Sequence, residues 1–167
     1  MPLTKVQLGM TDTLVSGTAV TASGTSVDFT GLPAGVKRIT VMFNGVSTNG
    51  TSNIVAQLGT SSGIESTGYV SGLSYAQAGN LTGAINSTAG FLGTNGSAAA
   101  NTNSGHFFIT LVSGNIWVAS CLISTSTTYN YFGGGNKTLA GTLDRVRITT
   151  VNGTDAFDAG TINILYE

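Results

Sequence analysis

The side chains that could perform acid–base or nucleophilic chemistry are few in this sequence and lie far apart. One histidine, His106, and one cysteine, Cys121, stand in a stretch from Ser66 to Asn136 that contains no Asp, Glu, Lys or Arg. Serine hydrolases need a nucleophile, a base and an orienting acid, and zinc sites need several Cys and His ligands. We therefore interpret His106 as a residue on a sheet surface, and Cys121, inside an apolar run, as a buried residue.

Two other segments have residues that a binding site could use. Asp155 and Asp158 form the closest acidic pair, and oxygen ligands around them are dense enough for calcium. Their spacing is not that of an EF-hand, so we interpret the segment as a turn held by side-chain hydrogen bonds. The run from Gly133 to Thr138 is similar to a phosphate loop, but Asn136 stands where the pattern needs glycine. We interpret it as a flexible glycine hairpin or loop, and we assign no catalytic, metal-binding or cofactor-binding residue.

Aromatic and basic residues have two interpretations each. The tryptophan and four tyrosines could stack on sugars, but in a β-protein they more often fill cores or subunit seams. The basic residues could join nearby acids in a salt-bridge cluster, or form an intersubunit contact. These residues are Trp117, Tyr69, Tyr75, Tyr129 and Tyr131, then Lys37, Arg38, Arg145 and Arg147 with Asp144, Asp155 or Asp158 as partners.

Composition narrows the class of protein. Only 8% of the 167 residues are charged, against about 25% in an average domain. The net charge of −1 argues against nucleic-acid binding, and it removes one obstacle to association between identical copies. The N-terminal residues lack the apolar core of a secretory signal, and no run approaches the ~18 apolar residues of a membrane span. We expect synthesis in a cytoplasm and no membrane insertion.

The pattern of apolar residues predicts strands separated by Gly- and Asn-containing turns. Alternation indicates strands with one buried face at most positions, and the run 116–124 is so continuously apolar that burial on both faces is expected. Residues 79–105 are predicted as long loops, with a short strand at most, and as a contact surface or a solvent-exposed loop. The fold class predicted is all-β, an antiparallel β-sandwich of jelly-roll type with about eight strands. The predicted strands are 27–29, 38–43, 54–58, 106–112, 116–124, 127–132, 143–151 and 161–166.

Two parts of the chain are distinguished. Residues 27–167 are expected to form one β-sandwich domain, and residues 1–26 an N-terminal arm or docking segment. The arm would bury its apolar side chains against a partner: Leu3, Val6, Leu8, Met10, Leu14 and Val15. The alternative is an edge strand that belongs to the sandwich itself.

Three segments resemble virion structural proteins of tailed bacteriophages, of the kind labelled tail-fibre proteins. The likeness runs over most of residues 27–167 and is most specific in 29–51 and 139–167, with 57–69 between them. Relatives often have a tryptophan in the turn where this chain has Ala34-Gly35, and no collagen-like or coiled-coil repeat precedes the segment here. The resemblance implies a non-enzymatic protein of the virion, made in the cytoplasm of a bacterial host, and a homotrimer by analogy.

Two virion roles and one other class follow as hypotheses. The first is an oligomeric module of a tail fibre or appendage, which contacts other virion proteins and takes part in particle assembly and host attachment. The alternative is a head decoration protein that binds and stabilises the capsid, which the short chain without a shaft favours. The other class is a lectin-like module that binds a glycan of the host surface; it would be stabilised by its sugar.

Overall fold

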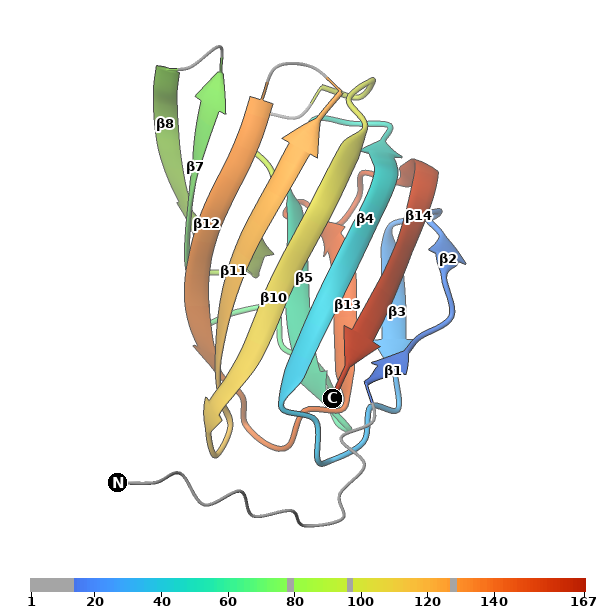
Figure 1. Ribbon diagram of the computed structural model, residues 1–167, viewed down its shortest axis with the longest axis vertical. Coiled ribbons are helices and arrows are strands. Elements are labelled where there is room, and N and C mark those ends of the chain that lie inside the picture. Colours follow the sequence, from blue (N-terminus) through green and yellow to red (C-terminus); the bar gives the residue numbers. More distant parts are fainter. Residues whose placement is uncertain (1–13, 78–79, 96–97, 127–128) are drawn as a thin grey trace, which may run out of the picture.

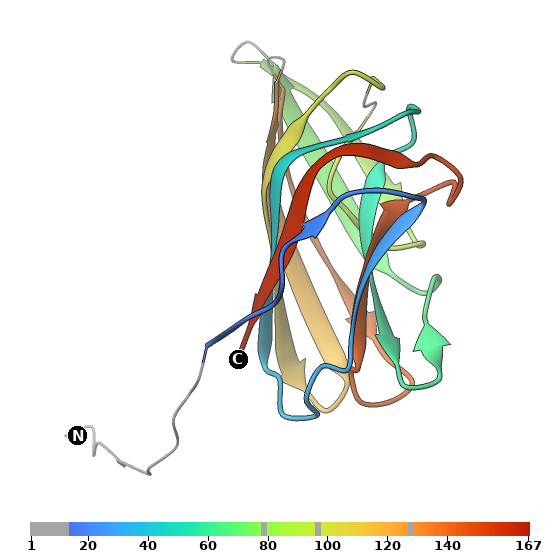
Figure 2. The same ribbon diagram turned by 90° about the vertical axis from the view of Figure 1, so that its right-hand side faces the viewer.

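The alternation in the sequence is realised as two stacked antiparallel sheets. The computed structural model describes residues 14–77, 80–95, 98–126 and 129–167, and these contain strands joined by turns and no helix long and apolar enough to cross a membrane. Figure 1 shows the large sheet in front of the small one, and Figure 2 shows the two layers edge-on. The all-β antiparallel sandwich predicted above is therefore confirmed.

The large sheet has the strand order β1-β14-β4-β10-β11-β12-β7-β8, with β2 also paired to β14. Its strands are β1 (Val15–Ser16), β2 (Val20–Thr21), β4 (Arg38–Thr48), β7 (Val70–Gln77), β8 (Asn80–Ser87), β10 (Asn103–Ser113), β11 (Ile116–Thr125), β12 (Tyr129–Thr138) and β14 (Phe157–Tyr166). The small sheet has the order β3-β13-β5-β6, with β9 paired to β5. Its strands are β3 (Ser26–Thr30), β5 (Ile54–Thr60), β6 (Gly63–Ile64), β9 (Phe91–Leu92) and β13 (Arg145–Thr150).

Four nested strand pairs give the sandwich a jelly-roll arrangement. From the outside inward along the chain, β3 pairs with β13, β4 with β10, β5 with β9, and β7 with β8. These pairs alternate between the small and the large sheet, as they do when one long hairpin is rolled into two sheets. The hairpin β11–β12 is inserted between β10 and β7, and β14 is added beside β4. The additions widen the large sheet and take the strand number above the eight predicted.

One hydrophobic cluster joins the facing sides of the two sheets. In the large sheet, β4 contributes Ile39, Val41 and Phe43, and the Phe43 ring lies 5.8 Å from that of Phe107 on β10. In the small sheet, β13 contributes Val146 and Ile148, opposite Arg145 and Arg147 on the outer side as predicted. Core residues of β10 and β11 follow the same period of two, because successive side chains of a strand point to opposite faces.

Two strands differ from the expected burial, and in opposite directions. The run in β11, expected to be buried on both faces, alternates between buried and exposed residues, so one of its faces is open. The shorter run in β5, expected to alternate, is buried at every position. The segment before β9 passes over β5, where the Gln57 amide donates a hydrogen bond to the Ala89 carbonyl oxygen at 2.9 Å. Both faces of a strand are buried only where another segment of the chain covers the face that points away from the facing sheet.

Two segments predicted as loops are strands. The region 79–105 contains β8 and β9 and the beginning of β10. Gly133 to Thr138, predicted as a flexible hairpin or loop, lies inside β12 between β11 and β7. A Cβ atom on Gly135 would lie 2.1 Å from the Val70 carbonyl oxygen, and one on Gly133 would lie 2.4 Å from the Gly72 carbonyl oxygen. These glycines therefore serve the close approach of β12 to β7.

The expected arm at residues 1–26 includes segments that pair with the sandwich. β1 pairs with β14 through Val15 and Ser16, β2 pairs with the same strand, and Ala22 belongs to the core. Leu14 is exposed. Leu3, Val6, Leu8 and Met10 of the expected arm lie outside the described residues.

Candidate functional site

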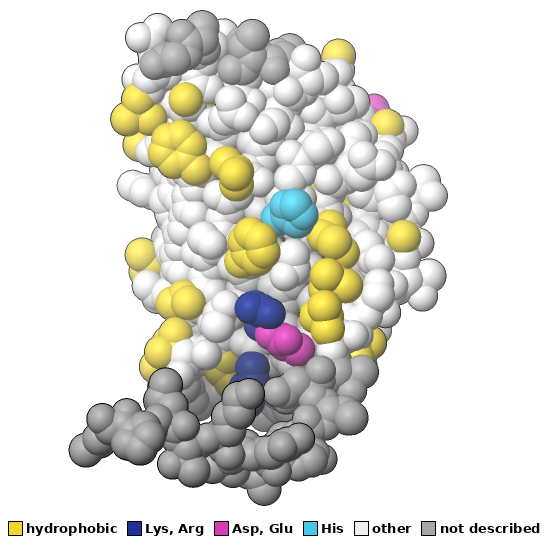
Figure 3. Space-filling view, viewed as in Figure 1, with side chains coloured by type: hydrophobic (Ala, Val, Ile, Leu, Met, Phe, Trp, Pro, Cys, Tyr) yellow, Lys and Arg dark blue, Asp and Glu magenta, His cyan; other side chains and the backbone are white. Residues whose placement is uncertain are grey.

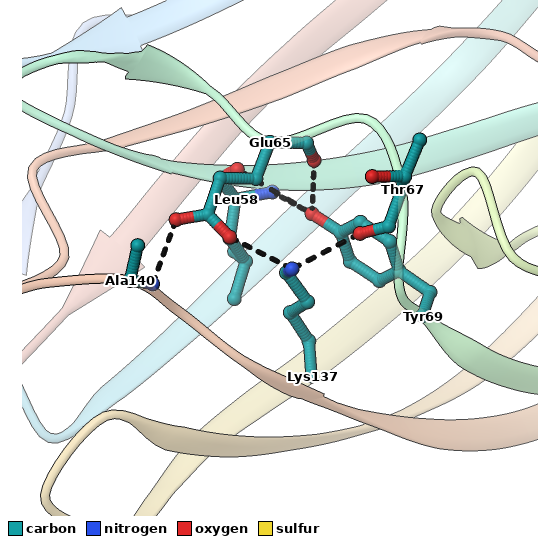
Figure 4. Close-up of polar contacts among 6 residues, drawn as sticks. All are labelled: Leu58, Glu65, Thr67, Tyr69, Lys137 and Ala140. Atoms are coloured by element: carbon teal, nitrogen blue, oxygen red, sulfur yellow. Dashed lines mark hydrogen bonds and ion pairs between the residues drawn. The ribbon is translucent and has the colours of Figure 1, made fainter.

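A partly buried ion pair joins the two ends of the uncharged stretch of the sequence. The two charged residues that bound this stretch, Glu65 and Lys137, meet with Nζ 2.7 Å from Oε2. Figure 4 shows that Lys137 also donates to the Thr67 carbonyl oxygen, at 3.0 Å, and that the Ala140 N–H donates to Oε1 of Glu65, at 2.8 Å. Burial by itself raises the pKa of Glu65, but the hydrogen bonds from Lys137 and Ala140 outweigh it and hold this pKa below its ordinary value.

Tyr69 is the third side chain of this cluster, and it contributes its hydroxyl group and the face of its ring. Its hydroxyl accepts a hydrogen bond from the Leu58 N–H at 2.6 Å and donates to the Glu65 carbonyl oxygen at 2.9 Å. The Lys137 Nζ lies 5.3 Å from the centre of the Tyr69 ring, in a cation–π contact. Burial raises the pKa of Tyr69 far above its usual range. The phenol is therefore a neutral structural donor, and the cluster fastens β12 to the segment after β6.

An open hollow beside this cluster has little capacity for catalysis. It has a volume of about 450 Å³ and is lined by residues 60–65 and 140–142. Ser61 in its wall is the centre of a Gly-x-Ser-x-Gly spacing, which in some hydrolases places a nucleophile on a strand-to-helix turn. Here Ser61 lies in the tight connection between β5 and β6. The histidine base would have to be His106, which lies on the large sheet, so the spacing does not form that site.

The two reactive side chains of the sequence lie on opposite faces of the large sheet. His106 is exposed, as predicted, and its ring stacks on Phe108 with the centroids 5.7 Å apart. Cys121 is buried, as predicted, and its Sγ lies 3.3 Å from the Leu92 carbonyl oxygen, to which it donates. Burial raises the pKa of this thiol to about 12. Neither residue is placed to act as a partner of the other.

The segment around Asp155 is a turn held by side-chain hydrogen bonds, as predicted. The Asn152 amide donates to Oδ1 of Asp155 at 2.7 Å, and the Ser52 N–H donates to Oδ2 at 2.8 Å. These two hydrogen bonds lower the pKa of Asp155. Asp158 accepts from the hydroxyl of Ser47 on β4. In the described part of the chain, no three His, Cys, Asp or Glu side chains gather as metal ligands would.

The three arginines Arg38, Arg145 and Arg147 form separate ion pairs, and they do not gather in one salt-bridge cluster. Arg147 holds Asp28 through two hydrogen bonds of 2.7 Å, across β13 and β3. Arg145 pairs with the adjacent Asp144. Arg38 lies on the other sheet and pairs with Glu167, with 2.5 Å between Nη2 and Oε1.

Most of the aromatic residues singled out above fill the core. Trp117, Tyr69 and Tyr131 are buried, and Tyr75 and Tyr129 pack partly buried against the core. The Tyr131 hydroxyl donates to the Asn95 carbonyl oxygen at 2.8 Å. Two phenylalanines that were not among the predicted candidates, Phe108 and Phe132, expose their rings to solvent on the large sheet.

These phenylalanines belong to the outer face of the large sheet, which is the most extended candidate site. The strand registers place three rows of side chains on this face: Asn163, Met42, His106, Leu122 and Phe132; then Leu165, Thr40, Phe108 and Ser120; then Arg38, Thr110, Val118, Asn136 and Val70. We call these three rows the outer face. Figure 3 shows apolar side chains distributed over this side of the molecule, with basic and acidic ones gathered toward its lower end. Arg38 in the third row pairs with Glu167.

The outer face is suited to contact and offers little for chemistry. Leu122 is 59% exposed, Phe108 46% and Phe132 41%, all on regular strands of a rigid sheet. Exposed apolar patches of this kind usually mark interaction surfaces. Alternation in β10 and β12 was the signal available in the sequence, since it places Phe108 and Phe132 opposite the buried residues. None of the family models, curated proteins or solved structures with which the chain was compared matches it.

Proposed function

We propose that this protein is a non-enzymatic structural component of a bacteriophage particle, an oligomeric module of a tail fibre or appendage. The observation that carries the proposal is the outer face, an exposed, nearly uncharged surface with apolar side chains on a rigid sheet. Such a surface fits stable contact between building blocks. The phage setting comes from the resemblance of residues 29–51 and 139–167 to virion proteins.

The disposition of the charged residues supports a role without catalysis. Eight charged residues of the described chain are engaged in four ion pairs: Glu65–Lys137, Arg38–Glu167, Arg145–Asp144 and Arg147–Asp28. Acid–base catalysis uses groups that are free to exchange protons in a cleft. Here the side chains of Lys137 and Tyr69 are held by protein partners, and the Cys121 thiol is buried.

Location on the particle tests the proposal. Antibodies against the purified protein, applied to negatively stained particles of the source phage, should label the tail or an appendage. Label over the head would replace the appendage role with the alternative of a head decoration protein that stabilises the capsid. Absence of label from disrupted and intact particles alike, with absence of the chain from their peptide mass spectra, would overturn the virion role itself.

A glycan-binding role is the second candidate, because Phe108 and Phe132 expose aromatic rings beside hydroxyl and amide side chains. Aromatic faces and neighbouring hydrogen-bonding groups are the means by which proteins hold sugars. Host envelope glycans at 100 times their dissociation constant should raise the stability of the fold by about 2.7 kcal/mol. An unchanged melting temperature across a panel of host glycans would remove this candidate and leave the assembly role intact.

A further inference from the structure

The outer side of the large sheet, with the three rows of the outer face at its centre, is large enough to be one half of a stable protein interface. At a strand spacing of about 4.8 Å and a rise of about 3.4 Å per residue, the strands from β14 to β8 and the outward positions from Ser104 to Val112 cover roughly 800 Å². A specific interface of standard size uses about the same area, ~800 Å², from each partner. Two hollows of the described residues, at residues 60–65 and between β3 and β14, lie away from this face. The outer face therefore suits a broad protein contact better than a small ligand, which is usually held in a concave site.

The side chains of this face have the composition of an interface between identical chains. Such interfaces are more apolar than the rest of the surface, with aromatic residues and Met enriched and charged residues depleted. Phe108, Phe132 and Met42 lie here together with Leu122 and Val118. The one ion pair, Arg38 with Glu167, is satisfied within the chain and lies at the end of the face. A partner that covers the three rows would therefore bury no unpaired carboxylate, ammonium or guanidinium group.

The near absence of charge also indicates which partner covers the face. Charged groups steer a different protein to its site and reject wrong partners. The first two rows of this face carry no Asp, Glu, Lys or Arg that could do so, and Arg38 of the third row is paired within the chain. Two copies of the same uncharged face need no charge complementarity and do not repel. The net charge of −1 for the whole chain adds almost no long-range repulsion.

We propose that the outer face of the large sheet is covered by another copy of this chain. The contact centres on Leu122, Phe108 and Phe132. This proposal deepens the assembly role above by naming the partner of the surface that carries it. Its test uses the purified chain alone, so a failure here is distinguishable from a failure of the virion role, which is read on particles.

The test is the mass of the full chain in solution, by light scattering after size exclusion, over a series of concentrations. The wild-type protein should have the mass of two or three chains of 16.9 kDa. Leu122→Asp should shift it to the mass of one chain and weaken association by about 100-fold or more, because it places an unpaired charge in the contact. Val151→Asp is the matched control: Val151 is 46% exposed, follows β13 away from this face, and should leave the mass unchanged.

A second variant keeps the result interpretable if Leu122→Asp does not fold. Phe108→Ser and Leu122→Ser together add no charge and should also give single chains with an unchanged circular dichroism spectrum. A wild-type mass of one chain at every concentration would overturn the proposal, as would variants that stay associated. Single chains that bind a host glycan or a different virion protein through Leu122 would overturn it in favour of that partner.

Discussion

The large sheet has two faces built from the same strands, and they are stabilised in different ways. The inner face, with Trp117 and Ile123 from β11, is buried in the core. The outer face, with Val118 and Leu122 from the same strand, exposes side chains of nearly the same character. Each face also carries an ion pair with an acid from outside its strand: Lys137 with Glu65 inside, and Arg38 with Glu167 outside. Apolar side chains of the same strand are thus buried on one face and exposed on the other, because only the inner face is covered by the small sheet.

The largest expected effect comes from placing a charge on the inner face. Ile39→Asp or Phe43→Asp should prevent soluble folding, because an unpaired carboxylate in the core costs roughly 5 kcal/mol or more, as much as many domains have in total. Ile39 is fully buried and Phe43 nearly so. Thr40→Asp, which points outward from the same strand, should remain soluble. Recovery of folded protein, judged by circular dichroism, would separate the two faces; two soluble, folded inner-face variants would show that the assignment of β4 is wrong.

The two ion pairs give the next contrast. The side chain of Lys137 is 8% exposed and that of Arg38 is 52% exposed. Lys137→Met leaves the partly exposed Glu65 without its ionic partner and should lower the free energy of unfolding by about 1–3 kcal/mol, whereas Arg38→Met should lower it by less than about 1 kcal/mol. Urea denaturation measures both. Combining Lys137→Met with Glu65→Leu should recover part of the loss, and equal losses in the two single variants would contradict the contrast.

The inner ion pair should also make stability depend on pH. The folded-state pKa of Glu65 is lowered, so its contribution is present above the unfolded-state pKa of about 4.3 and is lost as the pH falls through the lower folded value. Between pH 5 and pH 3 the wild-type protein should therefore lose more stability than Glu65→Gln, which has no carboxyl group to protonate. Melting temperatures of both proteins across this range give the comparison, and parallel curves would show that Glu65 contributes nothing to it.

Leu122→Cys is expected to have the smallest effect on stability. It allows the reactivity of thiols on the two faces of the large sheet to be compared. Cys121 is buried with its pKa raised to about 12, because burial disfavours the thiolate. Leu122→Cys places a second thiol one residue away, on the outer face. At pH 8 the added thiol should react with a disulfide reagent roughly 100-fold faster than Cys121, since reaction requires an accessible thiolate. If the protein associates as proposed, dilution should increase this difference. Similar rates for both thiols would mean that β11 does not hold one face closed.

The sequence patterns predicted the fold class and most of the strands, but they could not predict which strand faces are covered by other segments. The apolar run of β11 and the alternating run of β5 have the opposite burial to that expected, because the segment before β9 crosses β5 and no described segment crosses the outer side of β11. β7 and β8 were missed because their Ser-, Gly- and Asn-rich residues have weak strand propensity. Pairing with β12 supplies the stability that propensity lacks.

For the candidate site residues too, local patterns in the sequence predicted some placements correctly, whereas contacts between distant residues could not be predicted. His106 and Cys121 were placed correctly from alternation and from the apolar run, since both signals are local. The pairing of Glu65 with Lys137 joins residues at the two ends of the uncharged stretch, and only the approach of β12 to the segment after β6 brings them together. Of the two interpretations of the basic residues, a single salt-bridge cluster is wrong, because Arg38 and Arg147 lie on different sheets; the intersubunit contact stays a prediction.

The sequence by itself determined an all-β sandwich with few charges and the period of two that sorts the strands into two faces, because side-chain alternation is a local property of the backbone. Only the tertiary structure decided the jelly-roll pairing, the additional strands and which faces are covered. Burial depends on segments that are distant in sequence and meet in space, as the crossing of β5 and the ion pair of Lys137 show.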